Sequence, residues 1–199
     1  MPRSHAHDHL AKVEVDALGA LRAWFEAHHD QPESIWLVTY KKSVPDKYVA
    51  NTDVVDLCVA FGWMDGRRMK RDEARTMQLL SPRKAAHWSK SYKDRYARLV
   101  REGRMHPAGE RCVEAAKASG AWDFMNDVDA LIVPDDLQRA LDAEPTARAN
   151  YAAFPDSAKR DILRWIKLAK REATRQKRIA ETVRKAAIDA RASGTGKRG

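Results

Sequence analysis

The spacing of apolar residues changes near residue 81, and this change constrains the fold more than any other feature of the chain. Before it, residues 34–42 (SIWLVTYKK) are rich in aromatic and β-branched side chains and are followed by Pro45, which predicts a strand. From Pro82 onward, apolar residues recur every three to four positions, which is typical of helices. The pattern predicts an α+β fold in which helix predominates, with a small N-terminal antiparallel sheet of about three strands and helices, followed by an all-helical C-terminal module.

The part before residue 82 also contains two predicted helices and a predicted hairpin. Residues 12–29 carry apolar side chains at mostly three-to-four-residue spacing, and residues 53–61 form a shorter apolar stripe that ends at Gly62. After Gly62, the segments WMDGRRMKR and RTMQLL predict two strands that turn at residues 72–74.

Prolines, glycines and capping residues divide the second half into helices. The predicted helices cover residues 91–103, 107–120, 135–141, 145–154, 155–169 and 172–191. No spacer rich in Pro, Gly or Ser separates the halves, so we expect residues 12–104 to form an α+β region and residues 105–192 a helical module that shares its core. Residues 1–11 are expected to be a flexible tail and residues 193–199 a disordered one.

The two cysteines and the lengths of the apolar runs indicate in which cellular compartment the protein is expected. Cys58 and Cys112 lie far apart in apolar helical patterns, so we expect buried thiols in a reducing environment. The N-terminal segment MPRSHAHDHL has no apolar stretch, and the longest unbroken apolar runs, residues 35–38 and 57–61, are too short to span a bilayer. We therefore expect a cytoplasmic protein without membrane insertion.

The net charge of +9 is unevenly distributed along the chain. Residues 63–104 carry 13 basic and 5 acidic side chains (+8), and residues 156–199 carry 14 and 5 (+9), whereas residues 105–155 carry 4 and 9 (−5). Two basic blocks therefore flank an acidic one, which favours an anionic partner and makes nucleic acid a candidate.

The first basic block holds one candidate anion site. Its cations at positions 67, 68, 70 and 71 alternate between the two faces of a strand, so only half of them can join one surface. The Arg-Lys pair at 83–84 precedes Trp88 and a helix N-terminus, where backbone N–H groups favour anions and the indole can stack on a ring. The alternative is that Trp88 packs in the core and the cations are solvated. The assigned residues are Arg67, Arg83, Lys84, Trp88, Ser89 and Lys90.

A second candidate anion site lies in the last helix, where Arg171, Arg175 and Arg178 fall on one face. Three guanidinium groups aligned in this way suit phosphates or carboxylates. The alternative is an exposed polar face whose arginines pair with Glu172 and Glu181 or with the acidic middle block.

Asp65 lies close to Trp63 within the segment WMDGRR. The carboxylate either serves as a base in a pocket or braces Arg67 and Arg68, and its arginine-rich surroundings favour bracing because they stabilise the ionised, weakly basic form. We assign Trp63 and Asp65 to a candidate pocket.

No cofactor, metal or catalytic residue is assigned. The alternating His5, His7 and His9 could bind a metal only weakly, because a tail lacks the supporting contacts of a metal site. The chain contains no zinc-spaced Cys/His set and no nucleotide, dinucleotide or serine-nucleophile motif.

Four segments, VVDLCVAFGWMDGRRM, LLSPRKAAHWSK, RLVREGRMHPAGERCVEAAKASGAW and RDILRWIKLAKREATRQKRIAETV, resemble the YdeI/OmpD-associated family, also called OmdA or bacteriocin-protection proteins. The resemblance covers about residues 15–188. It implies a small bacterial cytoplasmic protein with an α+β part and a helical OmdA-like module over residues 105–192, associated with bacteriocin resistance and stress. One departure is WSKSYKDR, where the family pattern has an asparagine and this chain has Tyr92 and Lys93.

Together, these features predict a protein that acts by binding an anionic partner, either a ligand or another protein, without evident catalytic activity. One alternative is a nucleic-acid-binding protein without sequence specificity, since no readout motif is present. The other is an enzyme with a small-ligand pocket between the hairpin and the helical module. The oligomeric state is left open.

Overall fold

The computed structural model describes residues 9–84 and 87–192, which form two compact units that divide between Asp123 and Phe124. Each unit has its own cluster of buried apolar side chains. The predicted boundary at residue 104 and the predicted shared core are therefore wrong, because Val113 and Ala116 of the next helix are buried in the first cluster. Residues 1–8 and 193–199, which belong to the predicted tails, lie outside the described residues.

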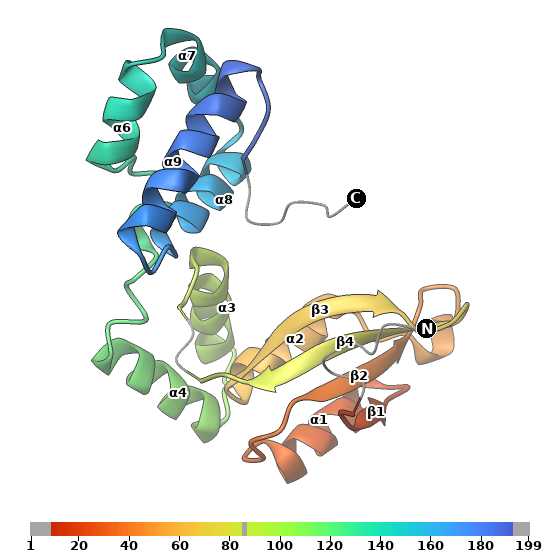
Figure 1. Cartoon of the computed structure of the whole chain (residues 1–199). Coiled ribbons are helices and arrows are strands. Elements are labelled where there is room, and N and C mark those ends of the chain that lie inside the picture. Colours follow the sequence, from red (N-terminus) through yellow and green to blue (C-terminus); the bar gives the residue numbers. More distant parts are fainter. Residues whose placement is uncertain (1–8, 85–86, 193–199) are drawn as a thin grey trace. The chain divides into compact units, whose positions relative to one another are not determined.

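The first unit contains a four-stranded sheet with the order β1-β2-β4-β3 (Figure 1). The strands are β1 (Lys12–Glu14), β2 (Ile35–Tyr40), β3 (Trp63–Lys70) and β4 (Arg75–Pro82). β2 and β3 both pair antiparallel with β4, whereas β1 runs parallel to β2. The β3–β4 hairpin and its turn after Lys70 confirm the prediction.

Strand β1 and helix α1 (Leu18–His28) replace the single helix that was predicted over residues 12–29. β1 is only three residues long, and its one apolar residue, Val13, lies between two charged residues. Its strand conformation depends on pairing with Trp36 to Val38 of β2, far along the chain, so local periodicity does not reveal it.

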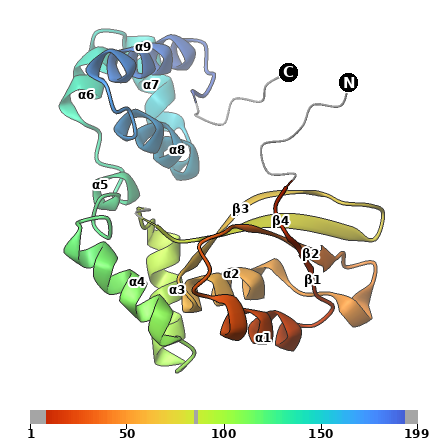
Figure 2. The ribbon, with the colours of Figure 1, turned by 60° about the horizontal axis from the view of Figure 1, so that its bottom comes forward.

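Helices α1 and α2 (Asn51–Ala60) cover one face of the sheet (Figure 2). Strand β2 is buried on both faces, with Ile35 and Leu37 in the cluster beneath the helices and Trp36 in a smaller cluster on the opposite face. This two-sided burial explains why the strand is apolar almost throughout.

Helices α3 (Lys90–Arg101) and α4 (Pro107–Ala118) complete the first unit. Gly109 allows α4 to approach the end of α2, because a Cβ atom at this position would lie only 2.1 Å from the carbonyl oxygen of Ala60. Gly62 reverses the chain after α2 with a φ of +76°, a conformation that favours glycine. The close contact between α2 and α4 therefore depends on these two glycines.

A buried carboxylate holds α3 against α2. Asp56 is 3% exposed and accepts hydrogen bonds from Arg95, from Arg98 at 2.6 Å and from Arg104 at 3.3 Å. Burial alone would raise the pKa of Asp56, but the hydrogen bonds from Arg98 and Arg95 outweigh it, so that the pKa lies below its usual value. Three cations of the first basic block thus have a structural role.

The second unit is a bundle of helices. In the described part of this unit they are α5 (Asn126–Asp129), α6 (Asp135–Asp142), α7 (Pro145–Ala153), α8 (Asp156–Lys167) and α9 (Glu172–Ala187). Helix α9 packs against α6, α7 and α8 around buried residues such as Leu137, Ile162 and Ile166. The four longer helices confirm the prediction, whereas the short helix α5 was not predicted.

The structure confirms the predicted α+β class, in which helix predominates, with four strands where about three were expected. None of the helices in residues 9–84 and 87–192 is long and apolar enough to cross a membrane.

Candidate functional site

A cavity of about 560 Å³ lies within the first unit. Its lining comes from the turn after α1, the end of α2, the segment after β4, helix α4 and the turn that follows α4. Pockets of this size hold small organic ligands. The cavity lies inside this unit, where the segment after the hairpin meets α4, a helix of the predicted module over residues 105–192.

Helix α4 forms one wall of the cavity. Its lining residues recur at the spacing that places them on one face of a helix, and all of them except Arg111 are small. They are Ala108, Arg111, Cys112, Ala115, Ala116 and Ser119. Because small side chains leave the helix surface nearly flat, a ligand can lie close to the backbone here.

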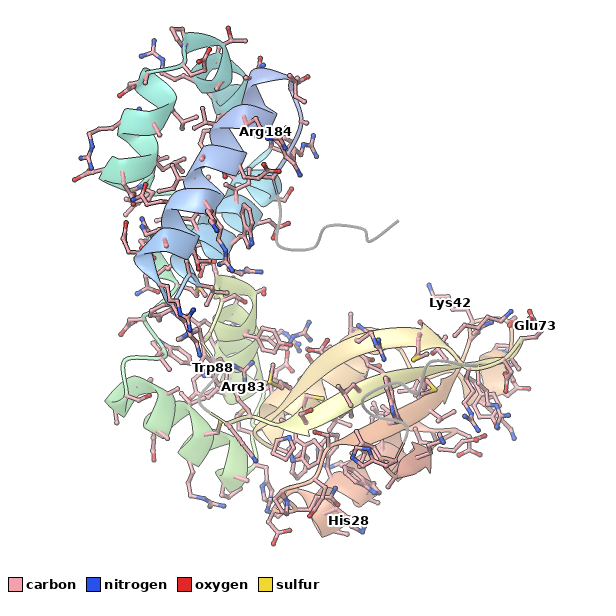
Figure 3. The ribbon with its side chains drawn as sticks, viewed as in Figure 1. His28, Lys42, Glu73, Arg83, Trp88 and Arg184 are labelled. Carbon is pink, nitrogen blue, oxygen red and sulfur yellow. The ribbon has the colours of Figure 1, made fainter. Side chains whose placement is uncertain are left out.

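Arg83, directly after β4, belongs to the lining of the cavity. Its backbone N–H donates to the carbonyl of Gly62 at 2.9 Å, which fixes the chain at the cavity edge. The residue is only 9% exposed, and its guanidinium carbon lies 4.1 Å from the centroid of the Trp88 ring and 4.7 Å from that of Tyr92. Figure 3 shows Arg83 and Trp88 beside each other at this place.

The guanidinium of Arg83 has no carboxylate partner among the described residues. Within the described ranges, the guanidinium donates a hydrogen bond from Nη1 to the carbonyl of His87, which is long at 3.4 Å. Burial is the main cause that lowers the pKa of Arg83, while nearby Tyr92 and Asp65 act in the opposite direction. Contact with two aromatic rings offsets part of the cost of burying this charge. A buried cation with such weak polar contacts is a site that attracts an anion.

Three buried polar atoms around the cavity have no hydrogen-bond partner in the described part of the chain. They are Nε of Arg83, Nε1 of Trp88 and Nδ1 of His29, and all three residues line the cavity. Each unpaired buried group costs roughly 1–3 kcal/mol, and native proteins rarely leave one unpaired. All three atoms are shielded from solvent, so the cavity is bordered by polar side chains whose hydrogen-bonding capacity is not fully used within the described residues.

The opening of the cavity is charged. Lys84 and Arg111 line it with exposed side chains, and Asp30 is an exposed acidic residue on the same lining. Together with Arg83, the lining carries three cations and one carboxylate, so its net charge is positive.

The predicted anion-binding residues of the first block separate into two groups. Arg83, Lys84 and Trp88 line the cavity together. Arg67 instead lies over the ring of Trp36 at 5.8 Å, and Lys90 pairs with Asp94 at 2.7 Å. The hydroxyl of Ser89 lies 3.1 Å from that of Ser91 at the start of α3. Only the first group is therefore brought to one place.

Trp88 is 1% exposed, which agrees with the alternative that it belongs to the core. The residue also belongs to the lining of the cavity.

The predicted arginine face of the second unit is largely engaged within that unit. Arg175 binds Asp136 through two hydrogen bonds of 2.6 and 2.8 Å. Arg178 donates to the carbonyl of Trp165 and lies over its ring. Arg171 is exposed just before α9. The pairing of Arg175 agrees with the alternative that these arginines bind acidic residues of the middle block.

Trp63 and Asp65 do not line the cavity, although both support it. Nε1 of Trp63 donates to the carbonyl of His29 at 2.8 Å. Asp65 accepts hydrogen bonds from Gln78 at 3.2 Å and from Tyr92, the tyrosine that contacts Arg83. The described contacts do not include bracing of Arg67 or Arg68 by Asp65: Arg68 donates hydrogen bonds to Thr76 and Asn51, and Arg67 lies over the ring of Trp36.

Sequence reasoning missed His29, Arg111 and Cys112 as lining residues. The small residues at helical spacing in α4 were a usable signal. Only the position of β4 in the structure shows which face of α4 lines the cavity. Cys112 is half-buried and not fully buried as predicted, and burial raises the pKa of its thiol. Cys58 is buried as predicted.

The proposed weak metal site was His5, His7 and His9, of which His5 and His7 lie outside the described residues. Within the described ranges, no group of three or more His, Cys, Asp or Glu side chains is placed to hold a metal ion.

The fold and the cavity define a class: a two-unit α+β protein whose first unit contains a cavity and whose second unit is helical. Residues 13–112 match the family described as a domain of unknown function (DUF8412), and because this match spans half of the chain, the protein belongs to that family. Residues 130–188 match the family described as Bacteriocin-protection, YdeI or OmpD-Associated, which confirms the resemblance there. The segments VVDLCVAFGWMDGRRM and LLSPRKAAHWSK fall within the first match. Comparisons with curated proteins and with solved structures found no match.

Proposed function

We propose that this protein binds a small anionic ligand in the cavity beside Arg83, and that this binding is its role in bacteriocin protection or stress in the bacterial cytoplasm. The observation that carries the proposal is the buried guanidinium of Arg83, which has no carboxylate partner among the described residues and lies in the lining of a cavity with a surplus of positive charge. An anion in the cavity offsets part of the cost of burying this charge.

The link to bacteriocin protection rests on the second unit, where residues 130–188 match the family of that description. The ligand cavity lies in the first unit, which matches a family of unknown function. The proposal therefore assigns ligand recognition to the first unit, because the cavity lies there.

Nucleic-acid binding has less support, because many cations of the basic blocks already have partners. Arg95, Arg98 and Arg104 converge on Asp56. The second block shows the same feature, since Arg175 pairs with an aspartate of its own unit. Cations held in this way contribute less to a phosphate-binding surface than their number indicates.

An enzyme is the other alternative. The lining of the cavity contains a thiol, Cys112, but burial raises its pKa and leaves it a poor nucleophile. His106, next to the lining residue Phe61, accepts a hydrogen bond from the backbone N–H of Ala108 through Nδ1, so that atom is engaged at the start of α4. Binding alone is thus the function that the geometry supports best.

Isothermal titration calorimetry with a panel of small carboxylates and phosphates tests the proposal. We expect Arg83→Met to weaken binding roughly 10- to 150-fold, since hydrogen bonds to a charged group contribute about 1.5–3 kcal/mol. Arg101→Met is the matched control, because Arg101 is exposed at the end of α3 and does not line the cavity. The proposal fails if no anion binds or if both variants bind like the unchanged protein.

Fluorescence anisotropy with duplex and single-stranded nucleic acid at low and high salt tests the alternative. Tight binding that weakens steeply with salt, and that Arg83→Met does not alter, would favour the nucleic-acid function over the one proposed.

A further inference from the structure

We infer that His106 is an acid-sensitive cap of helix α4: the neutral imidazole holds the first turn of the helix in place, and protonation releases this turn together with the adjoining wall of the cavity. This property belongs to the fold without a ligand, so it goes beyond the proposed function.

The cap is a hydrogen bond that only the neutral imidazole accepts. His106 immediately precedes α4 and has the extended backbone of an N-cap residue, with φ −97° and ψ 147°. Its Nδ1 accepts a hydrogen bond from the backbone N–H of Ala108 at 3.2 Å. Serine, threonine, asparagine and aspartate, the usual residues at this position, keep an acceptor oxygen in mild acid. An imidazolium carries an N–H on both ring nitrogens, so protonation of His106 breaks the cap.

Protonation also places a positive charge at the unfavourable end of the helix. The N-terminus of an α-helix carries roughly half a positive elementary charge, which repels cations within the first turn. The loss of the hydrogen bond and this repulsion act in the same direction. Both therefore weaken the first turn of α4 in acid.

The rings around His106 favour the neutral form. The imidazole stacks on Phe61 at 4.6 Å and meets the ring of His29 edge-on, also at 4.6 Å. Burial is the main cause that lowers the pKa of His106 from its usual value of 6.5, and the neighbouring His29 is the second. Two imidazoles this close are not easily protonated together.

The charged groups near His106 come from α1 and from α4, whereas the end of α2 contributes the uncharged Phe61. Besides His29 in the turn after α1, they are Arg22 and Arg111, which oppose protonation, and Glu26, which favours it. The first turn of α4 also carries Glu110.

The capped turn belongs to the wall of the cavity. Ala108, whose N–H bonds to the imidazole, lines the cavity, and so do Phe61 and His29, whose rings contact His106. The backbone N–H of His106 donates to the carbonyl of Ala60 at 3.1 Å, which joins the start of α4 to the end of α2. A change at the cap therefore reaches the cavity directly.

The sign of the pH dependence follows from the lowered pKa of His106. The unfolded chain takes up the proton first, so the contribution of the cap to stability is fully present above the unfolded-state value of 6.5. It is lost as the pH falls through the folded-state pKa. The contribution of Asp56 changes only near and below 3.8, so the two effects fall in separate pH ranges.

NMR of the protein without ligand, between about pH 7.5 and 5, tests the inference. The amide resonance of Ala108 should titrate with the same midpoint as the imidazole of His106, because the two groups share a hydrogen bond. His29→Gln removes the neighbouring imidazole, so both midpoints should move together to higher pH. Hydrogen exchange, corrected for its intrinsic pH dependence, should show that residues 110–112 lose protection in acid.

His106→Asn is the variant that isolates the cap, because asparagine supplies an acceptor oxygen and does not titrate. Over the same pH range, the melting temperature of the unchanged protein should fall by about 2–4 °C more than that of His106→Asn, the scale of one helix cap in a chain of this size. His28→Asn is the matched control. His28 is exposed near the C-terminus of α1, where a positive charge is favourable, so this variant should keep the full acid sensitivity.

An Ala108 amide that does not follow the titration of His106 overturns the inference. Equal acid sensitivity of His106→Asn and the unchanged protein also overturns it. Neither measurement involves a ligand, so these outcomes leave the proposed function standing. Conversely, a failure of all anions to bind removes the proposed function and leaves the acid-sensitive cap intact.

Discussion

Replacement of Arg83 by methionine should stabilise the unliganded protein while it weakens ligand binding. The buried guanidinium has no carboxylate partner among the described residues, and the effective penalty for such an ion is several kcal/mol. Contacts with the Trp88 and Tyr92 rings return roughly 1–2 kcal/mol each, and the long bond to His87 returns at most about 1 kcal/mol. Methionine keeps an unbranched apolar chain in the same space, so we expect a net gain of about 1 kcal/mol in the free energy of unfolding.

Urea unfolding without added ligand measures this change. The midpoint should rise with an unchanged slope, and the melting temperature should rise by about 2–4 °C for a chain of this size. The exposed control Arg101→Met should stay within about 0.5 kcal/mol of the unchanged protein. A loss of more than about 1 kcal/mol in Arg83→Met would refute the reasoning, because it would show that the guanidinium is a structural element of the core.

The remaining predictions concern the packing that supports the cavity. Asp56→Asn should lower the free energy of unfolding by about 3 kcal/mol in urea titrations, because three arginines lose their shared carboxylate. Because the pKa of Asp56 is lower in the folded protein, the stabilisation by its ion pairs is fully present above the unfolded-state pKa near 3.8. It is lost as the pH falls through the folded-state pKa. Melting temperatures should therefore fall in acid for the unchanged protein more than for Asp56→Asn. Gly109→Ala should cost about 1–3 kcal/mol in thermal unfolding and weaken ligand binding, because the added Cβ meets the carbonyl oxygen of Ala60 at 2.1 Å. Gly19→Ala is its control and should stabilise by about 0.5–1 kcal/mol, since α1 leaves open space there; a similar loss in both variants would contradict the argument.

Local sequence patterns account for most of the fold. Strand β2, the hairpin and the longer helices were predictable because periodicity and turn residues act over a few neighbouring positions. The short strand β1 was not, since its conformation depends on pairing with β2. The division into two cores was also missed, because the apolar face of α4 does not show by itself which elements it packs against.

The candidate site was predictable only in part. The segment Arg83 to Trp88 stood out as cations next to an aromatic, and the structure places Arg83, Lys84 and Trp88 on one cavity. The same composition drew attention to Lys90 and Arg175, which instead pair with aspartates of their own units. Sequence alone does not distinguish a paired cation from an unpaired one.

The sequence by itself determined the class of fold, most of its elements apart from β1 and α5, and the presence of excess positive charge around residue 83. Tertiary structure decided which charges have a partner. It brought Arg95, Arg98 and Arg104 to Asp56. It left Arg83, which belongs to the lining of the cavity, without an ion-pair partner among the described residues. The physical reason is that helix and strand formation depend on near neighbours, whereas the partner of a buried charge is set by the packing of segments far apart in the chain.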